Sequence, residues 1–192
     1  MKQLGLAMLN YQSEHGLLPP AVVYGEDGKP LYSWRVLILP YLEEQDLYDR
    51  FKLDEAWDSP HNIQLLSEMP LAYAPPPGKK SKVPDFHTVC KVFVGKRAAF
   101  EGKEGLRLVD FTDGTSNTIL IAEAGVPVPW TKPEDLAYDP DQPLPCLRGL
   151  FKDGFRTSFA DGSMHWVSWE ISEKNLRALI TRNGGEIFDQ DW

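Results

Sequence analysis

The chain opens with MKQLGLAMLNYQSEHGLLPP at residues 1–20, and this stretch decides the interpretation of the fold. Its apolar side chains recur at helical spacing and form one stripe: Leu4, Ala7, Met8 and Tyr11. That period predicts an amphipathic helix over residues 2–15. Gly16 favours a helix end at that point, and Pro19-Pro20 forbids continuation. We therefore expect an N-terminal helix that lays one apolar side along a sheet.

Strand patterns gather in the middle and C-terminal parts of the chain. TVCKVFVG at 88–95 alternates in polarity, and the apolar run 118–124 indicates a second strand. FRTSFADGSMHWVSW at 155–169 places Asp161-Gly162 between two alternating runs, which predicts a hairpin. A helix follows, with Ser172 as its N-cap, so that hairpin and helix together cover about residues 155–183.

The order of these elements indicates the fold class. Short helices are expected over residues 41–52 and from residue 60 onward, and the strands come later. This segregation favours an α+β fold with an antiparallel sheet, in a single domain over residues 1–192. Two long loops, 75–87 and 125–147, are expected to be irregular and exposed. Asp113-Gly114 is a further structural turn.

Charge and composition exclude some classes of partner and location. The 192 residues carry a formal net charge of −8, which repels phosphate backbones and argues against nucleic acid as a partner. No apolar run approaches the length of a membrane-spanning helix, and no signal peptide is recognisable. The two cysteines, Cys90 and Cys146, leave a bridge and two free thiols open.

Catalytic patterns are not found. The four histidines are scattered and none has a zinc-binding spacing. Residues 114–118, GTSNT, half-resemble a nucleophile elbow around Ser116 but lack the closing glycine, so a tight turn is the better interpretation. The sequence therefore predicts no catalytic residue, no enzyme and no obligatory cofactor.

A few side chains are candidates for ligand contact. Asp110, Asp113 and Glu123 cluster in sequence around a turn, and carboxylates on loops can hold calcium. A solvated acidic turn is the alternative for these three residues. Asp139 and Asp141 lie in the proline-rich loop and are candidate binding residues. Trp130 lies in the same loop and is the best candidate among the tryptophans for an exposed contact with a sugar ring.

Several segments together resemble one family. They are the opening 21 residues, the block GKPLYSWRVLILPYLEEQDLYDRFKLDEAWDSPHN at 28–62, FTDGTSNTILIAEAG, VPWTKPEDLAYDP and the final SFADGSMHWVSWEISEKNLRALITRNGGE. The chain is similar to a planctomycete family of secreted proteins of unknown function with a type IV prepilin-like N-terminus, also described as solute-binding-like. Many members carry a histidine ten residues before the Asp-Gly pair, where this chain has Phe151.

The resemblance implies a pilin- or pseudopilin-like domain of the kind found in type IV pili and type II secretion. It implies a cell-envelope or extracellular location, other protein subunits or an extracellular ligand as partners, and a membrane anchor in an apolar helix upstream of Met1. We therefore expect a non-enzymatic structural or surface-interaction domain. The alternatives are an extracellular module that binds a glycan or peptide, and an unrecognised hydrolase.

Overall fold

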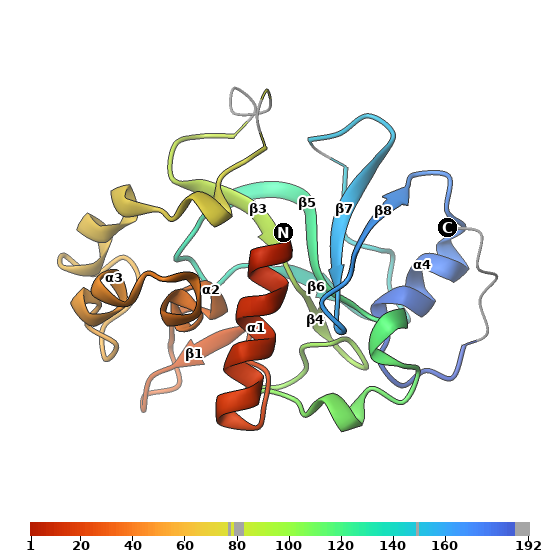
Figure 1. The fold of residues 1–192 in the computed structure, drawn as a ribbon, viewed down its shortest axis with the longest axis horizontal. Helices are drawn as coiled ribbons and strands as arrows, with labels where there is room; N and C mark the ends of the chain where they lie inside the picture. Colours follow the sequence, from red (N-terminus) through yellow and green to blue (C-terminus); the bar gives the residue numbers. More distant parts are fainter. Residues whose placement is uncertain (77, 79–82, 149, 187–192) are drawn as a thin grey trace.

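A four-stranded antiparallel sheet with a helix across one face is the centre of the molecule (Figure 1). The computed structural model describes residues 1–76, 78, 83–148 and 150–186. The strand order in the sheet is β3-β5-β7-β8 and every neighbouring pair is antiparallel. The bounds of these strands are β3 His87–Lys91, β5 Ile119–Pro129, β7 Gly154–Phe159 and β8 Met164–Ser168. The expected α+β class with an antiparallel sheet is confirmed.

The N-terminal helix, α1 (Lys2–His15), lies along this sheet as its apolar stripe predicts. Leu4, Ala7 and Met8 have no exposed surface. Gly16 takes a left-handed conformation with φ 78° and its N–H donates to the carbonyl of Gln12, which ends the helix. In the described part of the chain, none of the helices combines the length and apolarity needed to cross a bilayer.

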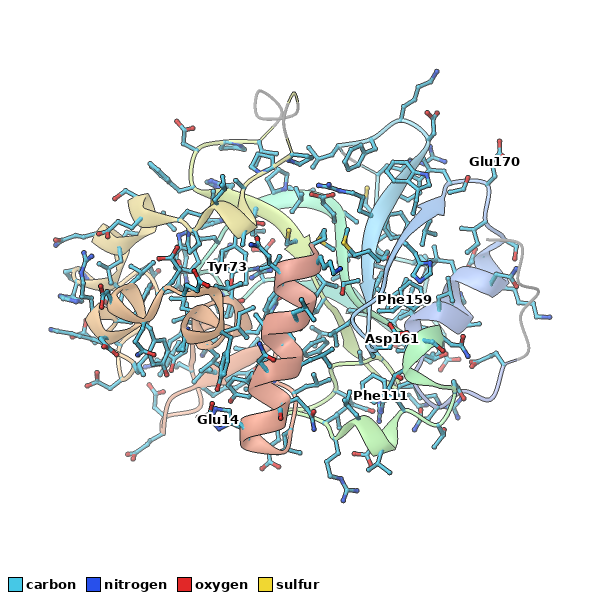
Figure 2. All side chains as sticks on the ribbon, in the orientation of Figure 1. Glu14, Tyr73, Phe111, Phe159, Asp161 and Glu170 are labelled. Carbon is cyan, nitrogen blue, oxygen red and sulfur yellow. The ribbon has the colours of Figure 1, made fainter. Side chains whose placement is uncertain are left out.

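The hairpin forms at the predicted position. β7 and β8 pair in regular register, with Arg156 opposite Trp166. Gly162 has φ 82°, a conformation that favours glycine, and the Asp161 carboxylate accepts a hydrogen bond from the N–H of Ser163 at 2.8 Å. Figure 2 labels Asp161 beside α1, at the end of the hairpin.

Short elements occupy the rest of the N-terminal half, beside α1 in Figure 1. They are β1 Val22–Tyr24, β2 Pro30–Ser33, α2 Trp34–Leu37, α3 Gln45–Arg50 and the 3-10 helices η1 Leu39–Leu42, η2 Asn62–Glu68 and η3 Leu71–Tyr73. Further 3-10 turns are η5 Leu108–Asp110 and η6 Thr115–Asn117. The short helices expected in this half are therefore present, as elements of one to about two turns.

The expectation that residues 125–147 form an irregular surface excursion is wrong in its first half. β5 continues to Pro129, and β6 (Leu136–Tyr138) pairs in parallel with β4 (Phe93–Gly95). Pro127 and Pro129 are tolerated because this end of β5 pairs only with β3, while the pairing with β7 covers Ile119 to Ala122. The sheet therefore reaches further than its apolar pattern indicated.

Two hydrophobic cores lie on opposite faces of the sheet. One packs α1 and the short N-terminal elements against Cys90, Leu120 and Ile121. The other packs Phe155 and Phe159 of β7 against α4 (Glu173–Ile180). Ser158 and Phe159 of β7 point to opposite faces of the sheet: Ser158 meets α1, and Phe159 belongs to the core that contains α4. Cys90 is buried, Cys146 is exposed and both thiols are free.

Candidate functional site

An apolar groove of about 660 Å³ is formed by residues in the described part of the chain. Side chains between Ser67 and Pro76 form one wall of the groove, and side chains from Val83 to Phe86 form the other. Arg156 of β7 also lines the groove. Two large apolar side chains of this groove are exposed to solvent, Leu71 at 88% and Phe86 at 41%. Exposed apolar surface that lines a hollow is typical of a binding site.

Phe86 has an unusual backbone at the edge of this groove. Its φ is 60°, a left-handed conformation that is uncommon for a bulky aromatic residue. The conformation is held on both sides: the carbonyl of Phe86 accepts from the Trp130 N–H, and the His87 N–H donates to the carbonyl of Pro84. Strained residues that expose a side chain cluster at ligand sites, which favours a contact role for the Phe86 ring.

Arg156 and Glu123 form a two-point ion pair across β5 and β7. Nε of Arg156 donates to Glu123 at 2.5 Å and Nη2 donates at 2.7 Å. The Glu123 side chain is buried, whereas the Arg156 side chain is about one-third exposed at the groove. These hydrogen bonds to Glu123 raise the pKa of Arg156. Nη1 of Arg156 has no hydrogen-bond partner in the described part of the chain.

Trp130 is buried and donates hydrogen bonds to backbone carbonyls at both walls of the groove. Its indole N–H donates to the carbonyl of Leu66, next to Ser67 of one wall, and its backbone N–H donates to Phe86 of the other. The ring has no exposed surface and stacks on Tyr73 with ring centroids 5.6 Å apart. Figure 2 places Tyr73 among the short N-terminal elements. The expectation of an exposed sugar-binding Trp130 is therefore wrong, because the extension of β5 carries the ring into the core.

A buried ion pair anchors the segment after Trp130. Arg35 and Asp135 are 2.7 Å apart, and both side chains are almost completely buried. The other guanidinium N–H groups of Arg35 donate to the Ser33 hydroxyl and to the carbonyls of Cys90, Lys132 and Glu134. Sequence reasoning missed this pair, since the partners lie 100 positions apart. It fixes the path of the chain between β5 and β6.

The calcium candidates do not come together. Asp110 accepts from Arg107, which lowers the pKa of the Asp110 carboxyl, and Asp113 accepts from the N–H groups of Gly184 and Gly185. Glu123 is committed to Arg156. Among the described residues, no group of three or more metal-ligating side chains is arranged for an ion. Asp110, Asp113 and Glu123 therefore do not converge on one calcium ion, because each carboxylate has a separate structural partner.

The other predicted residues have structural surroundings. Asp139 and Asp141 are exposed but lie outside the groove: the Asp139 carboxylate caps the N–H of Asp141, and the Asp139 and Pro140 carbonyls accept from Arg177 of α4. Gly114 has φ 100° and its carbonyl accepts from the N–H of Asn117, so the Asp113-Gly114 turn is present.

The hydroxyl of Ser116, the residue at the nucleophile position of the elbow-like pattern, is not hydrogen-bonded to a histidine within the described residues. The serine that does contact a histidine is Ser163, whose hydroxyl lies 3.0 Å from Nε2 of His165, and both residues are exposed next to the hairpin turn. The convergence that would favour the hydrolase alternative is not seen around Ser116.

Comparison with known proteins adds one match. Residues 1–91 match a family model named SBP_bac_10, whose description is protein of unknown function (DUF1559). No curated protein and no solved structure matches the chain. The matched region contains α1, the short N-terminal elements and β3, and hence both walls of the groove but not Arg156. Over its first 91 residues the chain is thus similar to a family of unknown function whose name suggests solute binding.

Proposed function

We propose that the chain is a non-enzymatic structural or surface-interaction domain of a pilin- or pseudopilin-like protein in the cell envelope or outside the cell. The observation that carries this proposal is the position of α1, which lies along a four-stranded antiparallel sheet with Leu4, Ala7 and Met8 of its apolar stripe completely buried. A helical stem packed on a sheet is the arrangement that the resemblance to prepilin-like proteins implies.

The outer side of α1 supports a role in subunit contact. Lys2, Gln3, Leu6 and Asn10 are exposed on the helix, and Leu6 shows 46% of its surface. At its first residue, the Met1 sulfur lies 3.8 Å from the Cys90 thiol on the edge strand β3. The helix therefore starts over the sheet and presents a mixed polar and apolar face to partners. The membrane anchor in an apolar helix upstream of Met1 is part of the same proposal.

Location and neighbours test this proposal together. Cells of the source organism that carry an epitope-tagged gene are treated with a membrane-impermeant amine cross-linker and then fractionated. We expect the protein in the envelope or extracellular fraction, with cross-links from Lys2 to other protein subunits. A protein found only in the cytosol, without such cross-links, contradicts the proposal. Lys174, exposed on α4, provides the reference site on a different face.

A second candidate function is an extracellular ligand-binding module. The apolar groove favours it, since the groove has the volume of small-molecule sites and joins exposed apolar side chains to the charged groups of Asp85 and Arg156. The name of the family model that matches residues 1–91 points in the same direction. Both functions are compatible in one domain, because α1 and the groove offer different surfaces.

A further inference from the structure

We infer that the groove binds a single-chain amphiphile with an anionic head, of fatty-acid type, with the alkyl chain along the apolar walls and the head at Arg156. This inference rests on the ligand-binding candidate function and names its ligand class. Three features carry it: the chemistry of the walls, the unused face of the Arg156 guanidinium, and the burial of its partner Glu123.

The walls favour a hydrocarbon body over a peptide. Pro75, Pro76 and Pro84 have no N–H group to offer, and Met69, Leu71 and Phe86 contribute apolar side chains. A peptide in the groove would bury backbone C=O groups that meet few N–H donors on these walls, which weakens its binding. An alkyl chain has no such groups and gains affinity with each methylene that it buries.

The charge at one part of the groove favours an anionic head. Arg156 is the only basic residue among the described residues that line the groove. Glu123 occupies Nε and Nη2, so Nη1 stays available to donate to a carboxylate. Asp85 also lines the groove, but it is exposed and its charge is screened by water.

Glu123 has a positioning role in this arrangement. It is buried and holds the guanidinium in a fixed plane by two hydrogen bonds, so little side-chain entropy is lost when a head group binds. The stack of Arg156 on Phe151, with the guanidinium carbon 5.6 Å from the ring centroid, fixes the same plane from one side.

Calorimetric titration with three probes that share a ten-carbon chain and one peptide tests the inference: decanoate, 1-decanol, decyltrimethylammonium and an acetylated, amidated tetrapeptide of leucine. All probes are used below their aggregation limits with the intact chain. We expect decanoate to bind about tenfold more tightly than decanol, because its carboxylate accepts a charge-assisted hydrogen bond, and the cation to bind more weakly still. The peptide is expected not to bind.

Two variants locate the site and separate charge from folding. Arg156→Gln alone leaves Glu123 buried without a partner, so the test uses the double variant Glu123→Gln/Arg156→Gln, which keeps a neutral hydrogen-bonded pair. It should lose the preference for decanoate over decanol and still bind decanol. Phe86→Ala should weaken the binding of decanoate and of decanol about equally. Arg107→Gln, at an exposed Arg–Asp pair outside the groove lining, is the matched control and should change neither.

The outcomes distinguish the ligand class from the binding function. If the peptide binds more tightly than decanoate, or if decanol and decanoate bind equally to the unmodified chain, the fatty-acid inference is overturned while the groove remains a binding site. If no probe binds, or if Phe86→Ala changes nothing, the groove is not the site and the ligand-binding function fails with it.

Discussion

At the residue scale, the buried charges on the sheet have a structural role. Arg35 and Asp135 pair with each other and with several backbone groups, and Lys91 of β3 lies near Asp135 with only 4% of its surface exposed. Burial lowers the pKa of Lys91 below its usual value, and the negative charge of Asp135 partly opposes this effect. A cation that loses hydration without a direct ion-pair partner costs stability at neutral pH.

Lys91→Met should therefore raise the free energy of unfolding at pH 7, because the variant buries no charge at this position. The folded state binds the Lys91 proton less tightly than the unfolded state does, because the pKa of Lys91 is lowered on folding. With respect to Lys91, stability is therefore highest above pH 10.5, the unfolded pKa, and is lost as the pH falls through the pKa of the folded state. The advantage of the variant should thus shrink as the pH rises toward 10.5.

Urea unfolding of the unmodified chain and of Lys91→Met between pH 7 and pH 10.5 measures this difference. The comparison is needed because burial also raises the pKa of Tyr32 and Tyr41 to about 12, and stability from these tyrosines is lost at high pH in both proteins. Lys174→Met, at an exposed position on α4, serves as the control and should change stability little at any pH. A variant that is less stable than the unmodified chain at pH 7 contradicts the prediction.

At the element scale, the close approach of α1 to the sheet depends on Gly5. A Cβ atom at this position would meet the Ser158 hydroxyl oxygen of β7 at a distance too short for real atoms. The glycine is unfavourable in an isolated helix by about 1 kcal/mol, so its presence is explained by the packing and not by helix propensity. The Ser158 hydroxyl has no hydrogen-bond partner within the described residues, although it is buried.

Gly5→Ala should destabilise the chain by about 1–3 kcal/mol, as expected for an overpacked core, despite the gain in helix propensity. Ser158→Ala alone should be neutral or slightly stabilising because it removes an unpaired buried hydroxyl. In the double variant, the nearest remaining atom is the Ser158 Cβ at 3.3 Å, so most of the loss should be recovered. Chemical denaturation of the four proteins gives the coupling energy, and strictly additive effects would disprove the contact.

Most of the elements were predictable from local pattern. The stripe of α1, the Asp161-Gly162 hairpin and the Ser172 cap of α4 each depend on a few neighbouring residues, and each is found in place. Trp130 was not predictable from its surroundings, since Pro127 and Pro129 indicate a loop unless the pairing on one side of β5 is known.

The candidate site was less predictable than the fold. The groove combines segments around residues 67–76 and 83–86 with Arg156, and no local pattern links these positions. One signal was present and was missed: Glu123 stands within the apolar run ILIAEA, and a charge in such a run requires a buried partner. That reasoning leads to an arginine on a neighbouring strand, not to calcium.

At the scale of the whole molecule, one sheet separates two cores and shares its strands between them. Leu120 and Ile121 of β5 belong to the core under α1, while Ile119 and Ala122 belong to the core under α4. Loss of either core would expose one face of the same strand. Because neither core can be lost without disturbing β5, the two should unfold together as a single domain over residues 1–192.

The prediction is a single cooperative unfolding transition reported equally by both cores. Trp130 reports on the first core, and Trp169, stacked on Phe155 at 4.8 Å between ring centroids, reports on the second. In a chain labelled with 5-fluorotryptophan, the two resonances are assigned by single substitutions to Phe and followed by fluorine NMR during urea titration. Their midpoints should coincide, and the calorimetric and van't Hoff enthalpies should agree. Separate midpoints would mean that the sheet does not couple its two faces, and the chain would then consist of two folding units that share strand β5.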